Sequence, residues 1–328
     1  MTRTATTTLS TATIVLAASL LLASCSQAEE TVATATTTVD NCGDTVTLDG
    51  VPDNVTLLKP SAVSTLSALG VLDHVTHRAG QYPTEYYDDA TNATLDGIPS
   101  ITDRTDDSGH LQISREEVVA SGADLVLGET DTVNRQTLAS SDIPLIEEPA
   151  FCGAIDGDVT WDDVWDQIRL YGTVFNRPDQ ATALVDDLQR RLDTAQEASN
   201  AAGAGRSVAV LYPTLGGGVT YAYGTGSMAA PVVAATGASN VYADQSERVF
   251  DVTAEDIVDR DPDVIVALYS SGDSRDIVDE VNRLPGIDRT TAGRDQRILP
   301  MLLNYAEPPT PLALDGVDML NEYLREHP

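Results

Sequence analysis

Basic side chains are scarce in this sequence. Its 328 residues hold 19 Lys and Arg against 51 Asp and Glu, which gives a formal net charge of −32 at pH 7, and Lys59 is the single lysine. Because proteins bind nucleic acids by neutralising phosphates with Lys and Arg, this balance argues against a nucleic-acid partner. We interpret the excess of acid as an adaptation of the solvated surface rather than as a functional site.

Motifs of several enzyme classes are also missing. The chain has no Gly-x-Ser-x-Gly elbow, no phosphate-binding loop and no Gly-x-Gly-x-x-Gly after a predicted strand. Its three cysteines and four histidines lack the spacing of zinc or iron–sulfur sites. The sequence therefore favours a non-enzymatic protein with no cofactor and no directly bound metal.

The apolar run near the N-terminus, Ile14 to Leu22, is too short to cross a bilayer, which takes roughly 20 residues. It ends in Leu22-Ala23-Ser24-Cys25, and small residues before a cut site are typical of a signal peptide. The pattern resembles the lipobox of bacterial lipoproteins and implies a signal peptide over residues 1–24 with a lipid on Cys25. The alternative is an ordinary secretory signal with a chance cysteine. The Thr- and Ala-rich residues 25–40 are predicted to form a flexible tether.

Two cysteines remain once Cys25 carries a lipid. An even pair in an exported protein predicts a disulfide between Cys42 and Cys152. The alternative is two buried thiols.

The rest of the chain alternates short apolar runs with helical patterns, which predicts parallel sheets covered by helices. Strands are expected at 45–48, 55–58, near 75, from 101, at 124–127, 145–146, 207–211, 219–223 and 264–268; helices are expected at 64–69, 114–120, 135–139, 161–171, 178–201 and 229–236. Residues 113–119 and 252–258 match at an offset of 139, each with a Ser or Thr three residues before an acid, which indicates a helix N-terminus.

We therefore predict an α/β fold of two Rossmann-like lobes, residues 41–160 and 205–328. The helical segment 161–204 joins them, and its second helix forms a rigid bridge roughly 35 Å long. Ligands of open α/β sheets bind beyond the carboxyl ends of the strands, so a ligand cleft is expected between the lobes.

The order of these parts resembles class III solute-binding proteins, the extracytoplasmic receptors that deliver ferric siderophores, haem or vitamin B12 to ABC importers. The resemblance covers about residues 42–325 and includes the glycine-led stretch from Gly224 to Asp244. Asn41-Cys42-Gly43 and the distant Phe151-Cys152-Gly153 are most similar to actinobacterial siderophore-binding members. The resemblance implies a ferric siderophore as ligand, an ABC permease with its ATPase as partners, and a place on the outer face of the cell membrane.

Alternatives to that role stay open. The ligand could be haem, with His110 and a tyrosine as axial ligands, or vitamin B12. An enzyme or envelope adhesion protein on the same fold is a further alternative. Scarce arginines among the pocket candidates and the negative net charge argue against a highly anionic ferric catecholate.

Candidate ligand-binding residues lie at or near predicted strand ends, where aromatic faces and Arg or Tyr donors suit an oxygen-rich chelate. They are Arg78, Tyr82, Arg104, His110, Tyr212, Tyr221, Tyr223, Arg248, Tyr269 and Tyr305. The alternative for each tyrosine is a core or rim position, and for Arg248 and His110 a solvated surface position.

Overall fold

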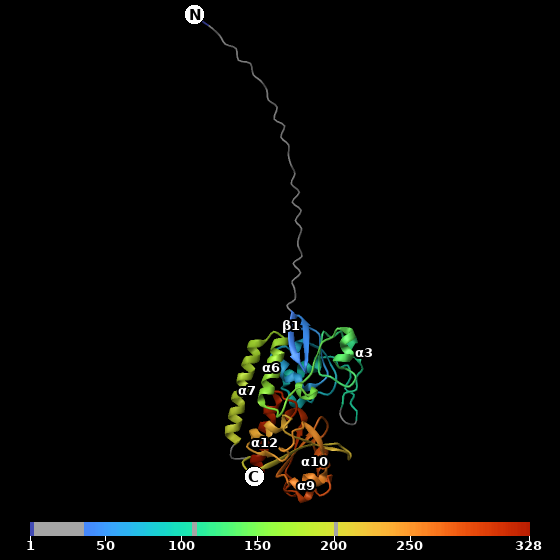
Figure 1. The fold of residues 1–328 in the computed structure, drawn as a ribbon, viewed down its shortest axis with the longest axis vertical. Helices are drawn as coiled ribbons and strands as arrows, with labels where there is room; N and C mark the ends of the chain where they lie inside the picture. Colours follow the sequence, from blue (N-terminus) through green and yellow to red (C-terminus); the bar gives the residue numbers. More distant parts are fainter. Residues whose placement is uncertain (3–35, 107–109, 200–202) are drawn as a thin grey trace. The chain divides into compact units, whose positions relative to one another are not determined.

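The computed structural model describes residues 1–2, 36–106, 110–199 and 203–328. The predicted signal-peptide cleavage site, Cys25 and the tether up to residue 35 lie outside the described residues. No helix in the described part of the chain is long and apolar enough to cross a membrane. Ala35–Pro328 form one unit, and it contains two lobes, each built around its own sheet (Figure 1).

The N-lobe is built around a four-stranded sheet in which every pairing is parallel. Its strand order is β4 (Val75–Arg78), β3 (Val55–Leu57), β5 (Leu125–Leu127) and β6 (Leu145–Ile146). Successive side chains of β5 enter different cores, because strand residues alternate between the two faces. Helices α1 (Val63–Ala68), α2 (Asp89–Gly97) and α6 (Trp161–Val174) contribute to one core, and α3 (Arg115–Ala120) and α4 (Arg135–Leu138) contribute to the other.

The C-lobe is built around a six-stranded mixed sheet. Its strand order is β10 (Val249–Val252), β8 (Thr220–Tyr223), β7 (Ser207–Pro213), β11 (Val264–Tyr269) and β12 (Ile298–Leu302), with β9 (Ser239–Asn240) beside β7. β7, β11 and β12 run parallel, whereas β8 is antiparallel to both of its neighbours, β7 and β10. Helices α8 (Ala229–Ala235) and α12 (Leu312–Glu326) contribute to one core, and α9 (Ala254–Arg260), α10 (Ser274–Arg283) and α11 (Thr291–Arg294) contribute to the other.

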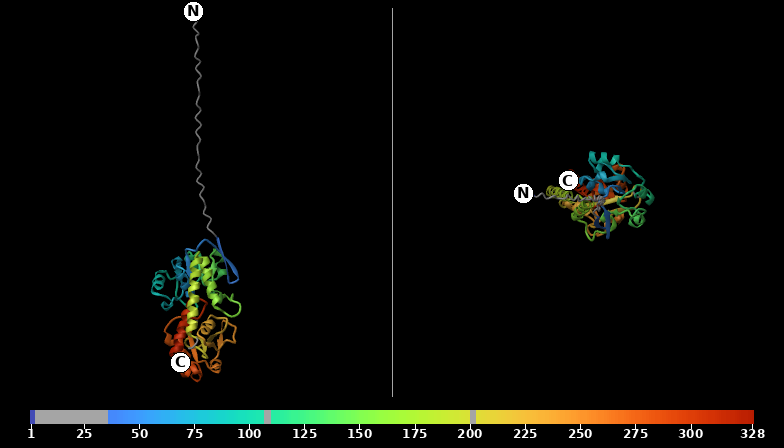
Figure 2. Two further views of the ribbon diagram at one scale, coloured as in Figure 1. Left: turned by 90° about the vertical axis from the view of Figure 1, so that its left-hand side faces the viewer. Right: turned by 90° about the horizontal axis from the view of Figure 1, so that it is seen from above.

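Helix α7 (Pro178–Ser199) runs alongside both lobes (Figures 1 and 2). Its 22 residues span about 33 Å at about 1.5 Å each, close to the predicted bridge. The buried side chains Ala181, Val185, Leu188 and Leu192 follow helical spacing and belong to the same core as the N-lobe helices. That core continues into the C-lobe through Met228, through Val232 and Ala235 of α8, and through Ala313, Leu314 and Val317 of α12. The prediction of two α/β lobes joined by a long helix is confirmed. The lobe boundaries at residues 160 and 204 stay predictions.

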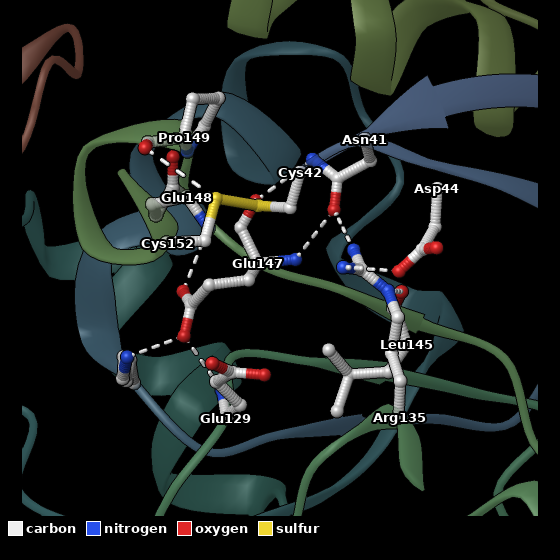
Figure 3. The surroundings of a disulfide bond; sticks show 11 residues. Asn41, Cys42, Asp44, Glu129, Arg135, Leu145, Glu147, Glu148, Pro149 and Cys152 are labelled. Carbon is white, nitrogen blue, oxygen red and sulfur yellow. Dashed lines mark hydrogen bonds and ion pairs between the residues drawn. A yellow bond between two sulfur atoms is a disulfide. The ribbon is translucent and has the colours of Figure 1, made fainter. Parts of the chain in front are cut away.

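The hairpin of β1 (Thr36–Asn41) and β2 (Asp44–Asp49) corrects the predicted end of the tether. Residues 36–40 were expected to be flexible, but they pair with β2. Cys42 and Gly43 both have positive φ, which suits a two-residue hairpin turn. Cys42 forms a disulfide with Cys152, as predicted, with 5.9 Å between their Cα atoms (Figure 3). The disulfide links the hairpin to α5 (Pro149–Cys152).

Two predicted helix starts are confirmed by their hydrogen bonds. The Ser114 hydroxyl accepts from the Glu117 backbone N–H and Glu117 bonds back, which completes a capping box for α3. The Thr253 hydroxyl accepts from the Asp256 N–H at the start of α9. The strand predicted from Ile101 is wrong: Ile101 lies in an irregular segment, where neighbouring Ser100 makes an isolated bridge with Arg78.

Candidate functional site

The two lobes meet where an N-lobe loop contacts the segment that follows β12. The rings of Tyr86 and Tyr305 pack edge to face with 5.1 Å between their centroids. The Tyr86 hydroxyl accepts from the Asn304 N–H at 2.9 Å, and the Tyr305 hydroxyl donates to the Glu85 carbonyl. Tyr86 and Tyr305 are both buried. These contacts place N-lobe aromatics directly against the carboxyl end of a C-lobe strand.

Two more tyrosines join them from neighbouring C-lobe strands. Tyr212 near the end of β7 and Tyr269 at the end of β11 are half-buried and pack against the same core as Tyr86 and Tyr305. We call Tyr86, Tyr212, Tyr269 and Tyr305 the tyrosine cluster. The Tyr212 hydroxyl lies 3.0 Å from the Ser270 hydroxyl.

The hydroxyls of Tyr86, Tyr269 and Tyr305 keep their protons. Burial raises the pKa of Tyr86 well above its usual range, and the nearby Tyr305, Tyr269 and Tyr212 add to the shift. Burial also raises the pKa of Tyr305 to about 12 and that of Tyr269 in the same direction. These three residues are therefore neutral phenols. The Tyr305 proton is already donated to the Glu85 carbonyl, whereas the Tyr269 hydroxyl can donate to a ligand oxygen.

Beside the tyrosine cluster, two cations from opposite lobes flank one aromatic ring. The Lys59 Nζ lies 4.3 Å from the centroid of the Phe151 ring, and the Arg248 Cζ lies 5.3 Å from it. Lys59 follows β3 and Phe151 belongs to α5, while Arg248 directly precedes β10. The side chains of Lys59 and Arg248 are 28% and 32% exposed. We call Lys59, Phe151 and Arg248 the cation pair site. Tyr223 connects it to the tyrosine cluster, because Arg248 and Tyr212 both influence its pKa, which burial raises.

Each cation is matched by one buried carboxylate. The Lys59 Nζ lies 2.5 Å from Glu147 Oε2, and the Arg248 Nη1 lies 3.1 Å from Glu307 Oε1. The Glu147 and Glu307 side chains are almost fully buried. Burial raises the pKa of Glu307, and the Arg248 guanidinium opposes that shift. The cation pair site therefore presents positive groups toward solvent while its net charge stays near zero.

A third buried carboxylate lies behind Lys59. Glu148 Oε1 accepts from the Tyr171 hydroxyl at 3.0 Å, and Glu147 Oε1 accepts from the Glu148 N–H at 2.7 Å. Burial, helped by the Glu147 charge, raises the pKa of Glu148 to about 8. At neutral pH Glu148 is therefore mostly protonated and adds little negative charge.

Glycines bring Arg248 and Glu307 together. A Cβ on Gly224 would lie 2.4 Å from the Gln245 carbonyl oxygen, and one on Gly226 would lie 2.6 Å from that of Ser246. This close approach lets Thr225 N–H donate to the Gln245 carbonyl at 2.8 Å. The Met228 N–H, just after this turn, donates to Glu307 Oε2 at 2.9 Å. The glycine-led stretch thus fixes the backbone around the cation pair site.

Apart from Tyr223, which lies between the two groups defined above, five of the predicted ligand residues lie outside them. Arg78 donates to the Leu95 carbonyl and stacks over Tyr82, whose hydroxyl donates to the Ala79 carbonyl. Arg104 is exposed and donates to the Thr102 hydroxyl. His110 has a 77% exposed side chain, 3.8 Å from Asp106. Tyr221 lies opposite Tyr212 in the sheet. Their roles in ligand binding stay predictions.

Two surface cavities lie away from the tyrosine cluster. One of about 420 Å³ is lined by Asp193 and Glu197 of α7, by the end of α8, and by Gly237 just beyond it. The other, of about 380 Å³, lies between Gly216–Gly218 and the end of α10. We favour the interlobe residues as the candidate site because strand ends, aromatic faces and cations converge there. Among the described residues, no group of three or more His, Cys, Asp or Glu is arranged to hold a metal ion.

Comparison with known proteins agrees with this two-lobed geometry. A family model described as periplasmic binding protein matches residues 55–301. The chain belongs to this family. An ABC-type Fe3+-hydroxamate transport protein from Saccharomonospora viridis is 49% identical, with a TM-score of 0.83, and the match covers 87% of this chain and 98% of that one. No curated protein sequence matches.

More distant structures share the periplasmic binding protein fold. A periplasmic binding protein from Veillonella parvula is 21% identical, with a TM-score of 0.68 and coverage of 88% of this chain and 91% of that one. A periplasmic haem-binding protein from Roseiflexus is 20% identical, with a TM-score of 0.66 and coverage of 84% and 98%.

Sequence reasoning missed Lys59, Phe151 and Tyr86 of this periplasmic binding protein. Lys59 carried a signal, because the single lysine of the chain directly follows a predicted strand end. Phe151 stood beside a cysteine that was expected to pair, which suggested a structural role only. Tyr86 lies between the strands predicted near residue 75 and from residue 101, and its contact with Tyr305 joins residues more than 200 positions apart.

Proposed function

We propose that this protein is the extracytoplasmic receptor of an ABC importer that captures a ferric hydroxamate siderophore and delivers it to the permease and its ATPase. The observation that carries this proposal is the interlobe arrangement of protonated tyrosines beside two cations that buried carboxylates compensate.

The charge of this arrangement suits a ferric hydroxamate. Such a chelate can be neutral overall, because each hydroxamate loses one proton and three of them match the charge of Fe3+. A ferric tris-catecholate keeps three negative charges and needs uncompensated cations. Lys59 and Arg248 each already face a carboxylate at 2.5 and 3.1 Å. Donors from Tyr and Arg can still bond the ligand oxygens.

The relationship to the Saccharomonospora viridis protein supports the same ligand class, since 49% identity extends over 87% of the chain. The likeness to the haem-binding protein, at 20% identity, supports the fold and carries no ligand assignment.

We further propose that the mature chain begins at a lipid-modified Cys25, which the Leu22-Ala23-Ser24-Cys25 pattern supports. The lipid would hold the receptor on the outer face of the cell membrane, next to its permease. Mass spectrometry of the mature N-terminal peptide tests this: a chain that begins elsewhere or lacks a lipid would contradict the proposal.

Ligand binding can be tested by quenching of intrinsic fluorescence with ferrichrome, a neutral ferric trihydroxamate. We expect saturable quenching, and no comparable binding of ferric enterobactin, a trianionic tris-catecholate. Tyr269→Ala should weaken ferrichrome binding about tenfold, equivalent to about 1.4 kcal/mol. The matched control is Tyr323→Ala in α12, where the ring stacks on His327 and binding should be unchanged. Absence of ferrichrome binding, or a Soret band on haem addition that is lost in His110→Ala, would overturn the hydroxamate assignment.

A further inference from the structure

The segment from Glu147 to Cys152 supplies two parts of the cation pair site. Glu147 holds Lys59, and Phe151 provides the ring between the two cations. This segment follows the end of β6 at Ile146 and includes only the four-residue helix α5. The segment therefore lies outside the hydrogen bonds that pair the strands, and other contacts must fix its position.

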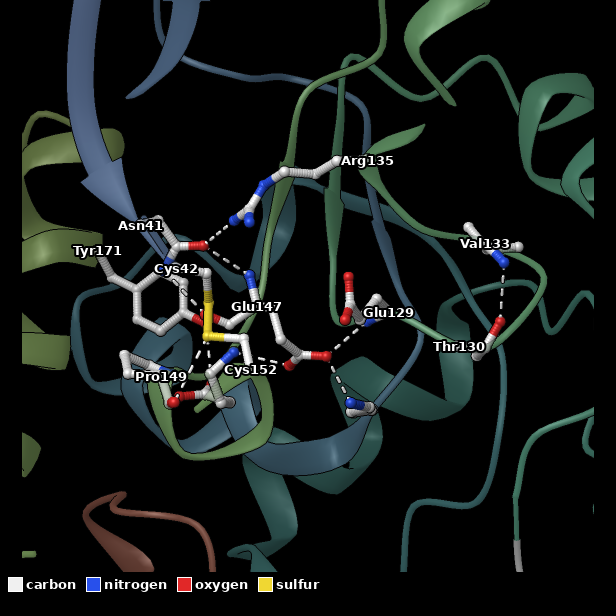
Figure 4. Close-up of polar contacts among 12 residues, drawn as sticks. Asn41, Cys42, Glu129, Thr130, Val133, Arg135, Glu147, Pro149, Cys152 and Tyr171 are labelled. Atoms are coloured by element: carbon white, nitrogen blue, oxygen red, sulfur yellow. Dashed lines mark hydrogen bonds and ion pairs between the residues drawn. A yellow bond between two sulfur atoms is a disulfide. The ribbon is translucent and has the colours of Figure 1, made fainter. Parts of the chain in front are cut away.

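The β1–β2 hairpin supplies several of those contacts (Figures 3 and 4). Asn41 Nδ2 donates to the Glu147 carbonyl and Asn41 Oδ1 accepts from the Glu147 N–H, both at 2.9 Å. The disulfide from Cys42 then holds the other end of the segment at Cys152. Asn41 is itself buried and also accepts from Arg135. The hairpin thus holds the segment at both ends, by hydrogen bonds at Glu147 and by the disulfide at Cys152. Phe151 directly precedes Cys152.

We propose that Asn41 and the Cys42–Cys152 disulfide are positioning residues for ligand binding: they hold Phe151 and Glu147 so that Lys59 and Arg248 face the ligand. This inference rests on the proposed function for its ligand. Its structural part, that the hairpin fixes the Phe151 ring, does not depend on any ligand.

The structural part can be measured by fluorine NMR. The chain contains three phenylalanines, so labelling with 4-fluorophenylalanine should give three resonances. Phe151→Leu assigns one of them. In the Cys42→Ser/Cys152→Ser variant we expect the Phe151 resonance to shift or broaden. Those of Phe175, buried at the end of α6, and Phe250, in β10 against Tyr242, should stay unchanged and report that the fold is intact.

The functional part is measured with ferrichrome. The double serine variant should bind it about tenfold more weakly than the wild type, and Asn41→Ala, which keeps the disulfide, should show a smaller loss of the same kind. Thr45→Ala is the matched control on the same hairpin. The exposed Thr45 hydroxyl donates to Asp40 of the same hairpin, 2.9 Å away, so binding should be unchanged. Dithiothreitol should reproduce the effects of the double variant. It passes two electrons and two protons to the protein disulfide, which becomes two thiols, and is itself oxidised to a cyclic disulfide. Reoxidation should restore both the resonance and the affinity.

The outcomes are distinguishable. An unchanged Phe151 resonance and unchanged affinity in the double variant would overturn the inference. If all three resonances collapse because the double variant does not fold, the Phe151 resonance and the affinity of Asn41→Ala decide in its place. If the wild type binds no ferrichrome, the proposed function fails, while the NMR comparison still decides whether the hairpin positions Phe151.

Discussion

Glu148→Gln should make the protein more stable, and the gain should depend on pH. The pKa of Glu148 is about 8 in the folded protein against an ordinary value of 4.5, because the carboxyl group is buried beside Glu147. Below 4.5 both the folded and the unfolded chain carry the proton. Between 4.5 and 8 the unfolded chain releases it while the folded chain retains it, so stability falls as the pH rises. The loss is about 1.4 kcal/mol per pH unit and about 5 kcal/mol in total.

Glutamine cannot ionise, so it removes this loss. Its side-chain carbonyl can still accept from the Tyr171 hydroxyl, as Glu148 Oε1 does at 3.0 Å. The unfolding free energy of the variant minus that of the wild type should therefore increase by about 3 kcal/mol from about pH 5.5 to about pH 7.5. Above about pH 8 the gain should level off, because the carboxyl group is then ionised in both states.

Urea unfolding followed by circular dichroism at several pH values measures the difference. The control is Glu116→Gln, which neutralises an exposed carboxylate on α3 and should give no comparable pH-dependent gain. A stability difference between Glu148→Gln and wild type that is constant across this range would refute the assignment of a retained proton to Glu148.

Two further substitutions test how neighbouring elements support the site. Gly316→Ala should weaken ferrichrome binding by shifting the tyrosine cluster, because a Cβ on Gly316 would lie 1.9 Å from the Tyr305 carbonyl oxygen. The fluorescence titration with ferrichrome measures this loss, with Ala313→Gly in α12 as a packing control. Ser114→Ala should destabilise the N-lobe by about 1 kcal/mol through loss of the α3 capping box, with little change in affinity, and a Ser114→Thr variant should largely restore the urea midpoint.

Local patterns were enough to predict the elements that carry their own signals. Ser114 and Thr253 marked helix starts, helical spacing indicated the long helix that begins at Pro178, and the cysteine count indicated the Cys42–Cys152 disulfide. The strand at Thr36–Asn41 was missed because its Thr-rich sequence is typical of a tether. Pairing with Asp44–Asp49, rather than its own composition, makes it a strand.

Only those residues of the candidate site that stand at strand ends could be predicted from the sequence. Tyr212 and Tyr269 were found because each stands at the end of an apolar run. The cation pair site could not be predicted, since Lys59, Phe151 and Arg248 come from three separate segments and meet through tertiary packing. For Arg104 and His110, a loop position did not determine which way the side chain would face.

The apolar core that lies along α7 has a consequence for how the two lobes fold. Because Val185 and Leu188 pack in the same apolar cluster as Met228 and Val317, neither sheet's helices complete their burial alone. A single lobe expressed alone would expose part of this cluster to water, and exposed apolar surface promotes aggregation. The two lobes share a sequence pattern at residues 113–119 and 252–258, yet they should melt together in a single calorimetric transition. The helix that they share would thus make them one cooperative unit.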